Sequence, residues 1–291
     1  KELKSRVEIF LKVIGMLLWC SRTACPEISY YVNMLCRHSS CPSDLALKLA
    51  MGVIAYLFGV KSVGIRFQKV DSPQLVAYYD ASNKGDPADG DKAQGGYILF
   101  LGEGPMDWRA FRLAHVGMSA QHNEYMVLAI VSQCITWFRS LLEDFGLTGE
   151  IVDMTGSLTD DPANDRLVDI ADGHDFGNIG WDSSPVPTLG DNNAAITLGT
   201  EDLVTVQNRF YSRLCHYAKV AYEEGRTLPL YVPSPLNLAD GFTKANPVAV
   251  FQAHFAQIRG LLTKPPVNRR LKQGSPATSL KPAKVKVVPS G

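Results

Sequence analysis

Apolar residues in the first sixty positions recur every three or four residues, a spacing that is typical of amphipathic helices. The pattern predicts three helices, at about 5–21, 27–39 and 43–58. Pro26 and Pro42 stand just before the second and third helices, where proline is tolerated, and Ser43 is a candidate N-cap. Residues 63–67 are predicted as a short strand. The chain is therefore expected to begin with a small helical segment.

Beyond residue 74 the pattern changes to short apolar runs that alternate with longer helical periods. Strands are predicted at 74–80, 95–102, 105–109, 186–190 and 228–232, and helices at 120–144, 192–199, 208–225, 236–244 and 247–262. Three strands followed by alternating helices and strands indicate an α/β fold in which helices flank a mixed sheet.

Charge is unevenly distributed, although Lys+Arg and Asp+Glu both total 29 among the 291 residues. The stretch 148–185 holds nine acidic residues and one basic residue, and 264–291 holds seven basic residues and no acidic one. Because the net charge is zero, affinity for nucleic acid would come from local patches rather than from the whole chain. The predicted organisation is a helical segment 1–70, a domain 71–262 with an acidic insertion 148–185, and a disordered, Pro-rich basic tail 263–291.

No segment of the sequence reads as a membrane span. Residues 7–20 loosely resemble the apolar core of a signal peptide, but Glu8 and Lys12 interrupt the run and no cleavage site follows. Nothing else approaches the roughly 20 apolar residues that a spanning helix needs. We expect a soluble, intracellular protein; its compartment stays open, and an organelle is one alternative.

Four cysteines are evenly spaced as C-x4-C-x10-C-x4-C, at Cys20, Cys25, Cys36 and Cys41. Structural zinc sites use closer pairs, because a tight turn must aim two sulfurs at one ion. A helix between Cys25 and Cys36 would separate the two pairs by roughly 16 Å. Buried free thiols are therefore predicted rather than a zinc site.

Four carboxylates stand out by their local setting: Asp80, Glu124, Asp191 and Asp240. Asp80 ends an apolar strand, Asp191 lies between a strand and a helix, Glu124 lies in the first turns of the long helix, and Asp240 follows the last strand. If these elements met at one edge of the sheet, the carboxylates would repel one another unless cations were present. All-oxygen ligation favours Mg²⁺ or Mn²⁺, and two such ions can promote phosphodiester cleavage.

The motifs around these residues occur in a recognisable order: "YYDAS", "GGYILFLG", "SAQHNEYMVLA", "LGDNNAAI", "SRLCHYAKVAYEEG" and "YVPSPLNLADGFTKA". In this order they resemble the ribonuclease H domain of copia-type LTR retrotransposon Pol polyproteins. The preceding helical region is similar to the segment that connects polymerase to ribonuclease H in those polyproteins. The resemblance covers roughly residues 8–262, except the acidic insertion.

The resemblance implies a five-stranded ribonuclease H-like fold and cleavage of the RNA strand of RNA–DNA hybrids with two Mg²⁺ or Mn²⁺ ions. It places Asp80, Glu124, Asp191 and Asp240 on the catalytic, metal-binding positions, with Asp80 between both ions and Asp240 on the second. His216 falls on a family histidine that could contact phosphate or move a proton, although a helical histidine is more often structural.

Other polar and aromatic residues allow two interpretations each. Ser82, Asn192 and Asn193 could contact a nucleic-acid backbone, although helix or turn capping is the simpler role. Trp108 and Trp137 are predicted in the core, with base stacking as the alternative.

The chain also departs from the family pattern. Basic and polar positions in "QHNEY" and "LCHYAKVAYE" are altered, Cys25 replaces an arginine, and the acidic insertion would repel phosphates unless it folds away. The alternative function is therefore a domesticated, non-catalytic scaffold or RNA-binding subunit of a ribonucleoprotein such as an organellar ribosome. In either case the acidic insertion and basic tail are the expected contacts with a polymerase portion or a larger assembly.

Overall fold

The computed structural model describes residues 2–67, 74–82, 92–145, 185–201 and 209–261. The predicted acidic insertion and basic tail lie outside these residues.

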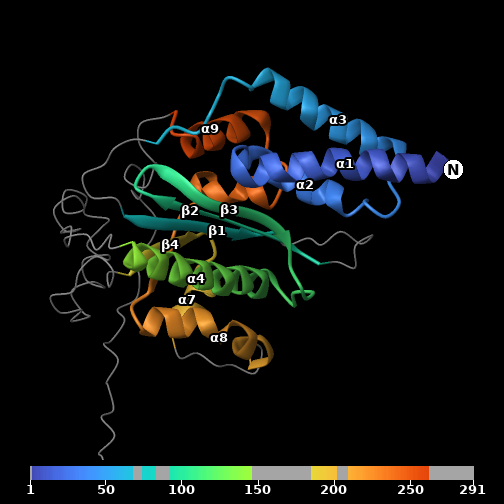
Figure 1. The fold of residues 1–291 in the computed structure, drawn as a ribbon. Helices are drawn as coiled ribbons and strands as arrows, with labels where there is room; N and C mark the ends of the chain where they lie inside the picture. The colour runs from blue at the N-terminus through green and yellow to red at the C-terminus, as the bar shows by residue number, and fades with distance from the viewer. Residues whose placement is uncertain (1, 68–73, 83–91, 146–184, 202–208, 262–291) are drawn as a thin grey trace, which may run out of the picture.

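A five-stranded mixed sheet forms the centre of the molecule (Figure 1). Its strands are β1 (Leu75–Ala81), β2 (Gln94–Leu101), β3 (Gly104–Arg112), β4 (Val186–Gly190) and β5 (Thr227–Tyr231), in the order β3-β2-β1-β4-β5. β1 pairs antiparallel with β2 and parallel with β4, and β4 and β5 are also parallel. This sheet, covered by helices on both faces, confirms the predicted α/β class with a five-stranded mixed sheet.

In the described part of the chain, one face of the sheet is covered by α4 (Ala120–Asp144), α7 (Asn193–Thr200) and α8 (Arg209–Glu223) (Figure 1). α4 begins where the sequence predicts because the Ser119 side chain caps it, accepting a hydrogen bond from the backbone N–H of His122. Its apolar side chains pack with the sheet in one core, which includes Val127, Val131 and Ile135. Among the described residues α4 alone is long and apolar enough to cross a membrane, but over half of its apolar window is buried, as expected of a core helix.

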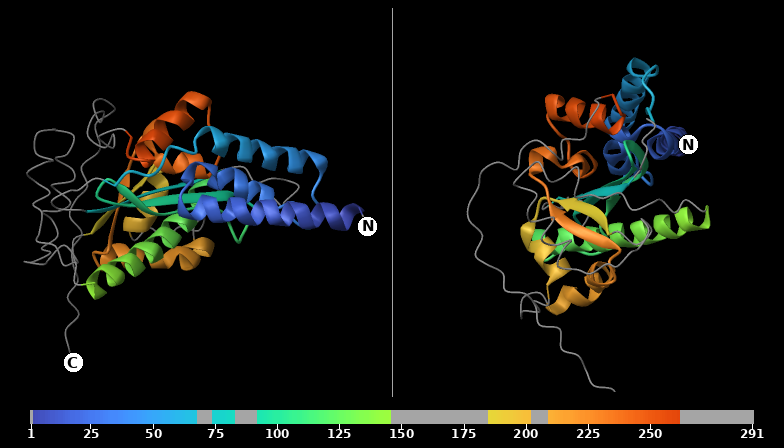
Figure 2. Two further views of the ribbon diagram at one scale, coloured as in Figure 1. Left: turned by 45° about the horizontal axis from the view of Figure 1, so that its top comes forward. Right: turned by 90° about the vertical axis from the view of Figure 1, so that its left-hand side faces the viewer.

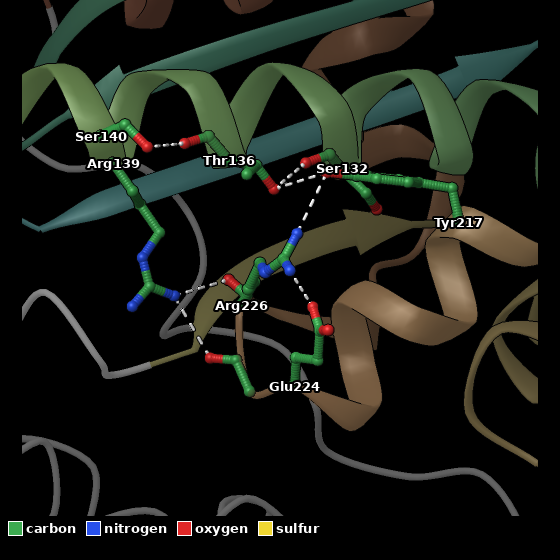
Figure 3. A network of polar contacts seen from close by, with 8 residues as sticks. Ser132, Thr136, Arg139, Ser140, Tyr217, Glu224 and Arg226 are labelled. Carbon is green, nitrogen blue, oxygen red and sulfur yellow. Dashed lines mark hydrogen bonds and ion pairs between the residues drawn. The ribbon is translucent and has the colours of Figure 1, made fainter.

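Polar contacts fix α4 against the turn between α8 and β5 (Figure 3). Arg139 donates to the backbone oxygens of Gly225 and Arg226, and the Tyr217 hydroxyl donates to Thr136 Oγ1 at 3.0 Å. The Arg226 guanidinium donates to the Tyr217 hydroxyl and forms an ion pair with Glu224. These contacts join α4 to α8 and to the turn that leads into β5.

The opposite face carries the short 3-10 helices η4 (Ser234–Leu236) and η5 (Leu238–Phe242) and the helix α9 (Val248–Ile258). It also carries α1 (Glu2–Thr23), the 3-10 turn η1 (Pro26–Ile28), α2 (Ser29–Cys36) and α3 (Asp44–Gly59). In the right-hand view of Figure 2 the blue helices lie on the side of the sheet opposite α4. The helices α1, α2 and α3 share a core that includes Phe10, Val32 and Ala50. As predicted, the Ser43 side chain caps α3.

The N-terminal helices are tied directly to the sheet. The Trp108 indole N–H on β3 donates to the Ser21 backbone oxygen at 2.6 Å, and Arg22 donates to the Trp108 backbone oxygen at 3.1 Å. Arg37 donates to the side-chain oxygen of Gln94 on β2. Glu27 of η1 forms a buried ion pair with Arg259, which follows α9.

Several expectations from the sequence were wrong. Residues 63–67 form no strand in the described structure, because the Arg66 backbone N–H instead bonds to the Arg259 backbone oxygen. The helix predicted at 236–244 is two 3-10 turns. Trp108 is buried as predicted, but Trp137 is 59% exposed. The four N-terminal cysteines form no disulfide in the described structure, but they are not the buried thiols that were predicted, since Cys20, Cys25 and Cys36 are only partly buried and Cys41 is exposed.

Candidate active site

Two parallel strands deliver two carboxylates to one edge of the sheet. Asp80 lies near the carboxyl end of β1, and Asp191 immediately follows β4. The register pairs Tyr78 with Leu189, so both acids leave the sheet at the same end. The carboxyl ends of parallel strands are where ligands bind in open α/β sheets.

Asp240 reaches the same edge from η5, which packs over β1 and β2. Asn237, fully buried, caps η5 with its side-chain oxygen, and its side-chain nitrogen donates to the Tyr79 backbone oxygen at 2.9 Å. On β2, Gly96 pairs with Asp80, and a Cβ there would lie 2.5 Å from the Cβ of Phe242. The close approach of η5 therefore requires glycine at this position.

Asp80, Asp191 and Asp240 form a compact carboxylate group. One oxygen from each lies within 4.8 Å of the others, and this is the sole group of metal-binding side chains found among the described residues. The four cysteines discussed above are therefore not part of such a group in the described structure. Asp80 and Asp240 are 3% and 6% exposed, whereas Asp191 is only partly buried.

Each of the three carboxylates is held by a different side chain. Thr243 Oγ1 donates to Asp80 Oδ2, and Ser234 Oγ donates to Asp191 Oδ2. The Lys244 ammonium lies 2.9 Å from Asp240 Oδ1. All three donors come from the segment 234–244, so one stretch of chain orients the whole group.

Glu124 lies beside this group, on the first turns of α4, and is 4% exposed. It is hydrogen-bonded to the Asp80 side chain and accepts a hydrogen bond from the backbone of Ala81. Its Oε2 is buried and has no hydrogen-bond partner. A buried carboxylate oxygen without a donor is costly, and a bound cation would satisfy it.

Burial and mutual repulsion raise the pKa of these acids. Burial first, and then the charges of Asp80 and Asp191, raise the pKa of Glu124 to about 10. Burial and the Asp240 charge raise the pKa of Asp80 to about 7, against the opposing hydrogen bond from Thr243. Burial also raises the pKa of Asp240. The metal-free group is therefore expected to retain protons near neutral pH, and its all-oxygen donors fit Mg²⁺ or Mn²⁺.

The raised pKa of Glu124 predicts that the metal-free protein loses stability as the pH rises. The folded state keeps a proton between about pH 4.5 and pH 10 that the unfolded state has lost, so the folded state binds more protons in this window. The free energy of unfolding should fall by up to about 1.4 kcal/mol per pH unit for this one group. Urea denaturation in EDTA between pH 5.5 and pH 8.5 measures this slope.

The matched variant for this measurement is Glu124→Gln, which removes the titrating group and keeps the shape of the side chain. It should flatten the pH dependence and be the more stable protein at pH 8.5. Equal slopes for the two proteins would mean that Glu124 does not titrate as described.

The other residues singled out from the sequence have mainly structural contacts. Ser82 extends the β1–β2 ladder through Gln94, and its backbone oxygen accepts a hydrogen bond from Asn123. Asn192 caps α7, accepting from the backbone N–H groups of Ala194 and Ala195. Asn193 follows it and is exposed.

His216 is exposed on α8. In the described part of the chain, none of the hydrogen bonds or ion pairs of the four acids involves this histidine.

Sequence reasoning missed the residues that position the acids: Asn237, Ser234, Thr243 and Lys244. The sequence spacing around Asp240 could have indicated three of them. Asn237 stands three residues before Asp240, as a capping residue would, and Thr243 and Lys244 follow it within one helical turn.

Comparisons with known proteins agree with the motif resemblance. The chain is 33% identical over 135 residues to a retrovirus-related Pol polyprotein from transposon RE1 of Arabidopsis thaliana, a match covering 46% of this chain and 9% of that polyprotein. It is 32% identical over 107 residues to a putative transposon Ty5-1 protein of Saccharomyces cerevisiae, covering 37% of this chain and 34% of that protein. These similarities confirm the predicted relationship to retrotransposon Pol polyproteins, of which the chain spans only a small part.

Further comparisons concern a mitochondrial protein, a solved structure and models of protein families. An uncharacterised mitochondrial protein of Arabidopsis thaliana is 28% identical over 128 residues, covering 44% of this chain and 52% of that protein. The solved structure of RNase H1 from Halobacterium salinarum aligns with 58% of this chain and 93% of its own, at 16% identity and a TM-score of 0.34. No model of a known protein family matches the chain.

Proposed function

We propose that this chain is a retroelement-derived, metal-dependent ribonuclease H that cleaves the RNA strand of RNA–DNA hybrids. The observation that carries the proposal is the meeting of Asp80, Asp191 and Asp240, with their oxygens within 4.8 Å of one another, at the carboxyl end of two parallel strands. Carboxylates that gather in this way repel one another unless they retain protons or a cation compensates their charge, so the arrangement favours cation binding. The similarity to Pol polyproteins supports a nucleic-acid substrate.

Asp80, Glu124, Asp191 and Asp240 would together hold two Mg²⁺ or Mn²⁺ ions. Such ions, when bound, activate water and stabilise the leaving oxygen of a phosphodiester. Asp80 interacts with each of the other three acids, so it is the candidate to be shared. Thr243 and Ser234 fix the orientation of Asp80 and Asp191 before the metal binds, which lowers the reorganisation needed on binding.

The test is hydrolysis of a labelled RNA strand in an RNA–DNA hybrid, with Mg²⁺ or Mn²⁺ and with EDTA. Cleavage of the hybrid with either metal, and none in EDTA, is the expected result. The same RNA as a single strand and in an RNA–RNA duplex should be cleaved at least about tenfold more slowly. A folded protein that cleaves the hybrid with neither metal would contradict the proposal and favour the non-catalytic scaffold.

A further inference from the structure

Lys244 lies in direct contact with the candidate metal ligands. It stands one helical turn after Asp240, and its backbone N–H bonds to the Asp240 backbone oxygen at 3.2 Å. Its ammonium lies 2.9 Å from Asp240 Oδ1, and its charge also acts on Asp80 and Asp191. A single cation therefore interacts with all three members of the carboxylate group.

The Lys244 side chain is well placed to leave this contact. It is 49% exposed, whereas that of Asp240 is 8% exposed, so the ammonium sits at the solvent side of a buried acid. Lysine carries a compact, strongly hydrated charge on a flexible stem, so the half-exposed ammonium can move into solvent when another cation takes over the charge of Asp240. The contact is thus better suited to a replaceable counterion than to a fixed structural link.

We propose that Lys244 is a built-in counterion that compensates Asp240 in the metal-free protein and competes with one of the two divalent ions. The inference rests on the proposed function, because it assumes that the acids bind metal. The Lys244 ammonium forms an ion pair with Oδ1 of Asp240 at 2.9 Å, whereas no ion pair of the described residues involves Glu124. Oδ1 of Asp240 and Oε2 of Glu124 are both buried and accept no hydrogen bond in the described structure. Glu124 and Asp80 would therefore be open to hold a first ion, and Lys244 would have to move away before Asp240 could hold a second.

The experiment is a calorimetric titration of Mn²⁺ into the nucleic-acid-free protein at pH 7.5. The wild type should show a tighter and a weaker step, and Lys244→Met should tighten the weaker step about tenfold while leaving the tighter step within about twofold. Lys244→Gln, a second neutral variant, should behave in the same way, and Lys244→Arg should resemble the wild type. Circular dichroism in EDTA checks that each variant is folded.

The matched control is Lys219→Met, since Lys219 also forms an ion pair with an acid one turn away, Glu223, at 3.6 Å on α8. This variant should leave both steps unchanged. The inference would be overturned if the Mn²⁺ affinity of the weaker step were unchanged or lower in both neutral Lys244 variants. That result is expected of a lysine that only orients Asp240 or contacts nucleic acid, because such a lysine does not compete with the metal ion. A wild-type protein that binds no Mn²⁺ would instead contradict the proposed function, so the two failures are distinguishable.

Discussion

Asp80→Asn is expected to abolish hybrid cleavage while making the metal-free protein more stable. Asp80 is 3% exposed and contacts the other acids, so its loss removes the ligand shared by both candidate metal positions. We expect kcat to fall at least about a thousandfold, which corresponds to about 4 kcal/mol of lost transition-state stabilisation. Asparagine keeps the shape of the side chain and an oxygen that can accept the hydrogen bond from Thr243.

The opposite change in stability has the same physical origin. Burial and the neighbouring Asp240 raise the pKa of Asp80 to about 7, so at pH 8 the folded protein carries an unfavourable charge that the neutral variant lacks. In EDTA the melting temperature of Asp80→Asn should exceed that of the wild type. Added Mn²⁺ should raise the melting temperature of the variant less than that of the wild type.

Asp107→Asn is the matched control for Asp80→Asn. Asp107 is another sheet carboxylate that accepts a hydroxyl hydrogen bond, from Tyr97 at 2.7 Å, but it is not in the carboxylate group. This variant should retain cleavage. If Asp80→Asn itself kept substantial activity, Asp80 could not be the shared ligand.

Local pattern was sufficient to predict the sheet and most helices. The runs that became β1 and β2 contain continuous apolar stretches, and the central positions of β1, β2 and the shorter β4 are buried. Asp80 and Asp191 could be expected at one edge because each ends such a run and the intervening segment contains a long helix, as a parallel connection requires. Their proximity itself was left open by the sequence, because it depends on β1 and β4 being parallel neighbours in the sheet.

Asp240 could not be placed by the same reasoning. Its position depends on Asn237 bonding to β1 and on Gly96 allowing Phe242 to lie against β2. These contacts join residues far apart in the sequence, and no periodicity reports them. The prediction of a strand at 63–67 was wrong for a related reason, because the backbone of Arg66 bonds to Arg259 rather than to another strand.

The final prediction concerns the buried ion pair between Glu27 and Arg259. Glu27 is fully buried and Arg259 is 5% exposed, and the pair joins η1 to the end of α9 across 232 residues of sequence. Arg259 also donates to the Val63 backbone oxygen. Arg259→Met should lower the free energy of unfolding by about 3–5 kcal/mol, because it leaves the Glu27 carboxylate buried without its partner.

Urea denaturation at pH 7.5 tests this, with Glu27→Leu/Arg259→Met as the informative second variant. Removing both charges should recover most of the stability, since two buried apolar side chains carry no uncompensated charge. Arg6→Met is the control, because the Arg6–Asp44 pair is exposed and should contribute no more than about 1 kcal/mol. A loss below about 1 kcal/mol in Arg259→Met would mean that water reaches Glu27 and that the N-terminal helices are held to the sheet chiefly by apolar packing and by the Trp108 and Arg22 contacts.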